Sequence, residues 1–273
     1  MKPETKTHLD EARRYLGKCA AKVSSRETSA RPLSASEKEM VIGFGTARDW
    51  IVWASALEDL SFSTKATRNS ARSQGITESV RFNQMWTATN ALFAKDSILI
   101  CALSPFLLTN TVTKSELKRF EVLYKFASID TQTEARCLDG INALLSMECQ
   151  AEGVPAEFKA DGTPTMWEVI YHKYLRPEDR ARKSGIGNTI TLKLNAAKNL
   201  NVGVTKKNRI DHALPAGDGP SLIYAARNWA VHGVLLTTFF RGSRQKYVTF
   251  IDNITMLLSM ALAGMARNLH AKL

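Results

Sequence analysis

An arginine, an amide and a histidine lie close together near the C-terminal end of the sequence, inside a run that is otherwise apolar. They are Arg227, Asn228 and His232, within the stretch 221–240. Charged side chains are rarely placed in such a run without a partner or a role. Imidazole exchanges protons near neutral pH, and the planar guanidinium group binds phosphate-like anions. These residue types therefore indicate a partner or a role for this stretch.

This stretch resembles the Arg-polar-x3–5-His signature of HEPN domains (higher eukaryotes and prokaryotes nucleotide-binding). Two flanking residues strengthen the resemblance, because Tyr224 precedes Arg227 by three positions and Gly233 follows His232 directly. An isolated Arg-x4-His pattern is common and carries little weight, so the flanking residues and the helical context matter. The stretch is typical of a HEPN motif helix.

A second stretch is also similar to HEPN sequences, in which an early core helix often carries a Trp-x3-Asn-Ala-Leu-aromatic pattern. Here it starts at Trp86 and Asn90 and ends at Phe93. Trp86 and Asn90 are one helical turn apart on the same face, so an amide on an apolar stripe needs hydrogen-bond partners. Asn90 either supports the site or only ties two helices together. The resemblance covers about residues 40–105 and 220–270, and nothing specific covers 106–219.

The resemblance implies a metal-independent endoribonuclease without a cofactor, in which the 2′-hydroxyl attacks the adjacent phosphate and leaves a 2′,3′-cyclic phosphate and a 5′-hydroxyl. His232 would act as general acid or base, and Arg227 would bind the phosphate and stabilise the transition state. Asn228 would orient the phosphate or the histidine, while Tyr224 would supply a hydrogen bond or only packing. Such family members act as bacterial toxins or in abortive infection and antiviral defence, so an antitoxin or regulator is an expected partner.

The geometry of a straight helix separates the two main residues of the motif. At ~100° per residue, Arg227 and His232 lie roughly 140° apart around the helix axis. Either the helix bends or ends near Gly233, or a working site takes residues from two copies of the motif. HEPN ribonucleases are known to use two motifs that face each other across a dimer interface. The resemblance thus implies a homodimer with the active site at the interface.

The charge balance indicates an anionic partner. The sequence has 37 Lys and Arg against 26 Asp and Glu, a formal charge of +11, which suits RNA but also serves solubility. Candidate RNA-binding residues are the dense cluster Lys173, Arg176, Arg180, Arg182 and Lys183, together with Lys206, Lys207, Arg241 and Arg244. The same basic surface would also suit the alternative function, a non-catalytic module that binds nucleic acid or nucleotides or regulates a partner.

The cysteines and the apolar runs indicate a cytoplasmic protein that does not enter a membrane. Four cysteines are scattered without a CxxC pair, which favours reduced thiols over disulfides or a zinc site. The first residues are charged and do not form a secretory signal. The longest apolar runs, such as 255–266, are too short to cross a bilayer.

Periodicity and short connections predict an all-α fold, an antiparallel helical bundle with additional helices and a loop-rich insertion. The resemblance implies that this bundle is of HEPN type. A helix and linker over 1–38 would precede a HEPN-like domain over 39–273, with the insertion at about 106–220. A capping box at Ser34 and Glu37 would start a helix that runs to about Leu60. The other helices are expected at 7–23, 77–103, 114–127, 131–149, 165–174, 221–240 and 247–272.

Overall fold

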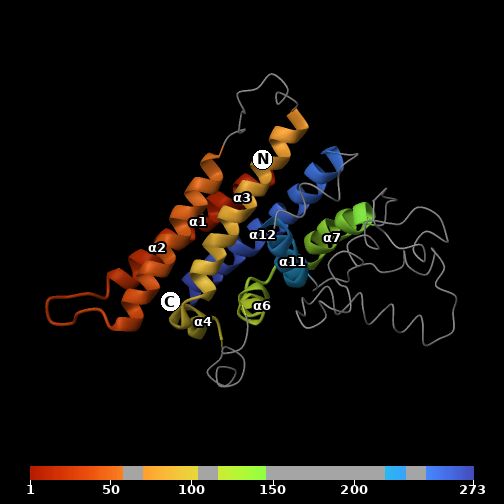
Figure 1. The fold of residues 1–273 in the computed structure, drawn as a ribbon. Helices are drawn as coiled ribbons and strands as arrows, with labels where there is room; N and C mark the ends of the chain where they lie inside the picture. Colours follow the sequence, from red (N-terminus) through yellow and green to blue (C-terminus); the bar gives the residue numbers. More distant parts are fainter. Residues whose placement is uncertain (58–69, 104–115, 146–218, 232–243) are drawn as a thin grey trace, which may run out of the picture.

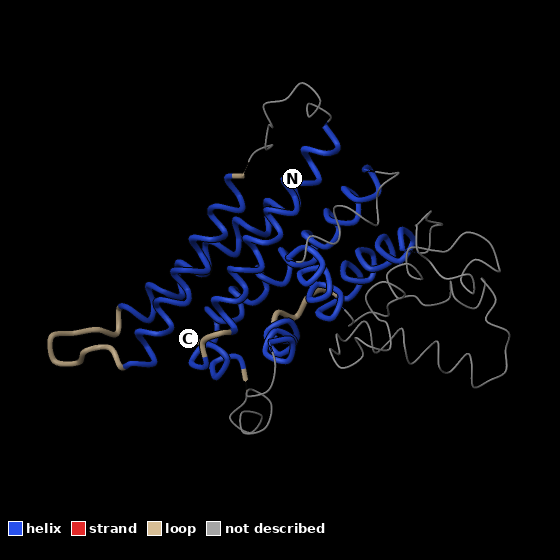
Figure 2. The backbone as a smooth tube through the Cα atoms, viewed as in Figure 1, coloured by secondary structure: helices blue, strands red, loops and turns tan. Residues whose placement is uncertain are grey.

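The computed structural model describes residues 1–57, 70–103, 116–145, 219–231 and 244–273. Every regular element in these ranges is an α-helix, and the only β contact there is a single bridge between Thr28 and Arg31. Figures 1 and 2 show the arrangement. The helices are α1 (Pro3–Ser24), α2 (Ala35–Ala56), α3 (Ser70–Phe93), α4 (Asp96–Ala102), α6 (Glu116–Phe126), α7 (Thr131–Leu145), α11 (Gly219–Val231) and α12 (Arg244–Lys272). The all-α prediction is confirmed.

Four long helices form a bundle in the cyclic order α1, α2, α3, α12, in which each helix packs against the next. The core is built from one apolar stripe of each helix. Leu9, Leu16 and Cys19 of α1 are fully buried, as their spacing predicts. On α12 the predicted stripe is also buried, with Ile251, Ile254, Leu258, Leu262, Met265 and Leu269 all at 0% exposure.

The bundle is only partly antiparallel. Arg26 pairs with Glu37 across the turn between α1 and α2. Farther along both helices, a Cβ built on Gly17 would lie 3.8 Å from the Arg48 side chain. Helices α1 and α2 therefore run in opposite directions. In contrast, α12 runs parallel to α1, because Lys2 bonds Asn253 and Cys19 bonds the carbonyl of Ala266. The antiparallel prediction is therefore wrong for α12. Short connections enforce antiparallel packing only between consecutive helices, and α12 does not follow α1 or α3 directly.

The start of α2 follows the predicted capping box. The Ser34 hydroxyl accepts a hydrogen bond from the Glu37 amide at 3.2 Å, and the Glu37 carboxylate accepts one from the Ser34 amide at 3.0 Å. These reciprocal bonds satisfy two amides that a helix terminus leaves unpaired. The predicted linker is accordingly short, since α1 continues to Ser24 and α2 begins at Ala35.

The single helix predicted over 77–103 is wrong, because the chain forms two helices there. The break falls at Lys95, whose backbone is extended, and α4 restarts with Asp96. Arg119 of α6 holds this corner by donating to the carbonyl of Phe93 at 2.8 Å and to the carboxylate of Asp96 at 2.5 Å. The break also changes the helical phase. Ile100 would share the apolar stripe of Trp86 and Phe93 in one continuous helix, but it is 48% exposed.

The three helices α6, α7 and α11 lie on one side of the bundle, where α6 packs against α3, α11 and α12. The first residue of α11 is held tightly, because a Cβ on Gly219 would come within 2.7 Å of a Glu134 carboxylate oxygen. That carboxylate accepts a hydrogen bond from the buried Tyr124 hydroxyl at 2.8 Å. Helices predicted over 114–127 and 131–149 correspond to α6 and α7, and the predicted helix over 165–174 lies outside the described residues.

Helix α12 is longer and more apolar than the run 255–266 suggested. Within the described part of the chain, Val248–Lys272 is the one segment whose length and composition could cross a membrane. A buried core helix has the same composition, and 78% of the apolar window is buried against the other helices here.

Candidate functional site

The described part of the predicted site lies where α3, α6 and α11 meet. Arg227 and Tyr224 are one turn apart on α11, and both reach Glu116, the first residue of α6. A guanidinium nitrogen of Arg227 lies 3.5 Å from one Glu116 carboxylate oxygen. The Tyr224 hydroxyl donates to the other oxygen at 3.2 Å. The two ends of a single carboxylate therefore hold both motif residues.

Aromatic rings form the base of this junction. The Trp86 ring of α3 lies edge-on to Phe120 with centroids 5.0 Å apart and to Tyr224 with centroids 5.9 Å apart. Phe93 completes the cluster at 5.7 Å from Trp86. Edge-to-face packing of this kind adds about 0.5–1.5 kcal/mol per pair to the burial of apolar area. The cluster fixes the Tyr224 end of α11 against α3 and α6.

The Arg227 guanidinium lies between two rings and an acid. Its central carbon is 5.9 Å from the Trp86 ring centroid and 5.8 Å from that of Tyr224, which is within the range of cation–π attraction. The side chain keeps 26% of its surface exposed. Because the two rings and Glu116 restrict the guanidinium while 26% of the side chain stays exposed, the group can meet an anion with little loss of side-chain freedom.

Tyr224 is held as a neutral hydroxyl. Burial, followed by the negative charge of Glu116 and its hydrogen bond, raises the pKa of Tyr224 above its ordinary value. A protonated phenol donates to a carboxylate, which agrees with the contact to Glu116. The geometry gives Tyr224 a hydrogen bond as well as packing, so both roles that the sequence left open for this residue are present.

Glu116 is the site residue that sequence reasoning missed. It lies more than a hundred positions before Arg227 in the chain, and nothing near it marks it as more than a charge at the start of a predicted helix. An acidic partner for the motif is plausible at Glu58 or Asp59 from the sequence, but both lie outside the described residues. Only the packing of α6 against α11 identifies Glu116.

Other predicted site residues are placed only in part. Asn228 belongs to α11, although its side chain lies outside the described residues, and His232 follows the last described residue of α11. Asn90 is half-buried on α3, one turn after Trp86, and its side chain makes no hydrogen bond to the part of the chain that the structure describes. Neither of the two roles considered for Asn90 is therefore seen among these residues.

The candidate RNA-binding residues fall almost entirely elsewhere. Arg244 is the first residue of α12, and its side chain is outside the described set. The remaining eight also lie outside it, namely Lys173, Arg176, Arg180, Arg182, Lys183, Lys206, Lys207 and Arg241. Their contribution to RNA binding stays a prediction.

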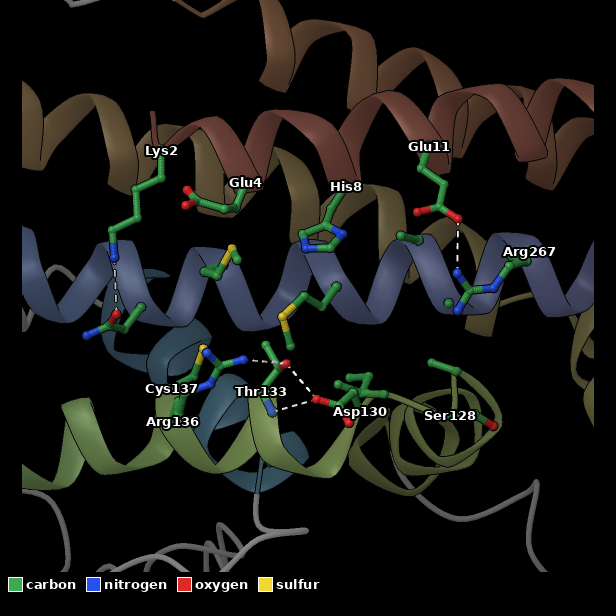
Figure 3. Close-up of a pocket in the computed structure, with 17 residues that line it drawn as sticks. Lys2, Glu4, His8, Glu11, Ser128, Asp130, Thr133, Arg136, Cys137 and Arg267 are labelled. Carbon is green, nitrogen blue, oxygen red and sulfur yellow. Dashed lines mark hydrogen bonds and ion pairs between the residues drawn. The ribbon is translucent and has the colours of Figure 1, made fainter.

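A separate groove of about 710 Å³ runs between α1, α7 and α12 (Figure 3). Two of its charged groups form an ion pair, Arg267 with Glu11 at 3.0 Å. His8 points into it from α1, and burial lowers the pKa of His8 below its ordinary value. None of the residues predicted for the site lines this groove, so the groove is separate from the predicted active site.

Comparisons with protein-family models, with curated proteins and with solved structures found no match for this chain. The case for a function therefore depends on the motif and on the geometry of the described residues.

Proposed function

We propose that this protein is an endoribonuclease of HEPN type, which cleaves RNA by attack of the 2′-hydroxyl on the adjacent phosphate and needs no metal ion. The observation that carries the proposal is the arrangement of Arg227, whose guanidinium lies within reach of two aromatic rings and Glu116 while 26% of its side chain stays exposed. An arginine fixed in this way can donate charge-assisted, bidentate hydrogen bonds to a phosphate with little reorganisation.

Each motif residue has a chemical task in this proposal. Arg227 binds the scissile phosphate and stabilises the charge that develops on its oxygens. His232 transfers the proton between the 2′-hydroxyl or the leaving 5′-oxygen and solvent, because its pKa suits neutral conditions. Asn228 orients the phosphate or the imidazole. Glu116 and Tyr224 act as positioning residues, since they contact Arg227 or its helix and not the reacting atoms.

The proposal extends to two copies of the chain. A straight helix places Arg227 and His232 on different faces, roughly 140° apart. Two motifs that face each other would bring the arginine of one copy to the histidine of the other. The basic surplus of the chain favours RNA as the substrate, and a cytoplasmic toxin or antiviral defence effector, restrained by an antitoxin or regulator protein, is the role that fits such an activity.

The test compares wild-type protein with His232→Ala on RNA in the presence of EDTA, and identifies the chemical form of the new 3′ ends. We expect cleavage by wild type that leaves 2′,3′-cyclic phosphates, and its loss in His232→Ala. His270→Ala is the matched control, because that histidine lies at the far end of α12 beside Tyr15. His270→Ala should cleave like wild type.

Two outcomes would contradict the catalytic assignment. Equal cleavage by wild type and His232→Ala would remove the histidine from the reaction, and a strict requirement for a divalent metal would point to different chemistry. Binding of RNA by both proteins with no cleavage by either would favour a non-catalytic binding module.

A further inference from the structure

The outer face of α2 exposes large apolar side chains that no part of the described chain covers. Trp53 is 64% exposed, Ile42 60% and Val52 38%. Tryptophan is usually well buried, and several exposed apolar residues on one helix mark a contact surface more often than chance. A shallow hollow of about 400 Å³ accompanies them, lined by residues between Thr46 and Trp53.

The residues of this face follow the spacing of a helix–helix seam. Ile42, Thr46, Asp49 and Trp53 stand at i, i+4, i+7 and i+11, and so form one stripe along the helix. We define these four residues as the α2 seam. The opposite side of α2 already packs against α1 and α3, so the seam is a second apolar face on a helix whose first face is buried.

A glycine beside the seam points to close approach by another backbone. A Cβ on Gly45 would meet no heavy atom within 4 Å, so nothing in the described structure requires glycine there. The other glycine of α2 differs, because a Cβ on Gly43 would lie 2.7 Å from Ile98. Glycine in a helix interior costs about 0.5–1 kcal/mol relative to alanine. The absence of a side chain at Gly45 is useful where a neighbouring helix comes close.

The order of residues along the seam is self-complementary. If two α2 helices pack antiparallel about a twofold axis between Ala47 and Arg48, Ile42 of each copy meets Trp53 of the other. The same axis places Thr46 opposite Asp49, a hydroxyl donor opposite a carboxylate acceptor. A twofold interface requires this reciprocity, in which residue i meets j and j meets i.

The charges on the face also fit a second copy. Arg48 and Asp49 form an exposed ion pair at 3.1 Å. In the twofold arrangement each Asp49 keeps this partner, because Arg48 lies at the edge of the seam toward α1, with its Cδ 3.8 Å from a Cβ built on Gly17. A lipid surface fits less well, because Asp49 lies at the centre of the stripe and its charge would have to enter the apolar layer.

We propose that the α2 seam is the docking site for the α2 seam of a second copy of this chain, with the two helices antiparallel. This interface is independent of the proposed nuclease activity. Helix α2 packs on α1, α3 and α4, whereas the motif helix α11 packs on α3, α6 and α12, so the α2 pairing does not use the motif helix. It can exist with or without a dimer that shares the active site.

The mass of the full chain across a dilution series, measured by light scattering and sedimentation, tests the proposal. We expect a dimer whose dissociation constant rises about tenfold or more in Trp53→Lys, since a tryptophan packed against the partner is a typical interface hot spot. Ile100→Lys is the matched control, because Ile100 is a similarly exposed apolar residue on α4. It should leave the dimer unchanged, and circular dichroism should show that both variants are folded.

A second experiment tests which residues of the two α2 helices lie opposite each other. A mixture of Thr46→Cys and Asp49→Cys chains should form a disulfide between the two new cysteines under mild oxidation, identified by peptide mapping. A protein that stays monomeric at all concentrations would overturn the proposal. A dimer that survives Trp53→Lys would place the interface elsewhere, and binding of the monomer to anionic vesicles through Trp53 would assign the face to lipid. Loss of the dimer with retained RNA cleavage would leave the nuclease activity intact but would contradict a site shared between two copies.

Discussion

Asp252→Asn should make the protein more stable at neutral and alkaline pH. Asp252 lies on α12 in a half-buried position, and burial is the largest cause that raises its pKa from 3.8 to about 6. The nearby carboxylate of Glu78 raises it further, while Lys2, the N-terminal amine and Arg81 lower it. The folded state therefore disfavours the charged form of this one carboxyl.

The sign of the pH dependence follows from the direction of this shift. The folded protein holds the proton on Asp252 more tightly than the unfolded chain does. Asp252 therefore lowers the free energy of unfolding least below about pH 4, where it is protonated in both the folded and the unfolded chain. This loss of stability grows as the pH rises through about 6. A difference between pKa 3.8 and about 6 corresponds to about 3 kcal/mol, and solvent near a half-buried carboxyl reduces this to about 2 kcal/mol.

Urea unfolding from about pH 4 to about pH 8 measures the effect. We expect Asp252→Asn to exceed wild type by about 2 kcal/mol in free energy of unfolding at the alkaline end, and to match it at the acid end. Asp139→Asn, an exposed change of the same charge on α7, should show no such pH-dependent gain. A variant no more stable than wild type at alkaline pH would refute the argument that burial destabilises the charged carboxylate.

Two further predictions concern packing and the site. Gly43→Ala should destabilise the fold by about 1–3 kcal/mol, because its Cβ would lie 2.7 Å from a side-chain atom of α4. Gly17→Ala should stabilise the fold by about 0.5–1 kcal/mol, because the nearest atom to its Cβ would be 3.8 Å away. Equal urea unfolding midpoints for these two variants would contradict this prediction. Glu116→Gln should tighten RNA binding about fivefold in a cleavage-deficient background, because the carboxylate competes with phosphate for Arg227. Fluorescence anisotropy measures this, and a similar gain in Glu121→Gln, an acid on the same helix, would show that only net charge matters.

The helices and their apolar faces could be predicted because their signals are local. The hydrogen bonds of a helix join residues four apart, and a capping box joins residues three apart, so Ser34 and Glu37 predict the start of α2 from a few letters. The buried stripe of α12 likewise follows from the spacing of its leucines and isoleucines. The apolar run likewise marked Arg227 as an unusual residue, and the resemblance to HEPN motifs added Tyr224.

What the tertiary structure decided depends on residues distant in the chain. Arg119 of α6 holds the break between α3 and α4, and this break turns Ile100 toward solvent. The parallel course of α12 follows from packing after a long connection and not from any local pattern. Glu116 became a partner of Arg227 only through the approach of α6 to α11, because an ion pair over such a separation leaves no periodic trace in the sequence.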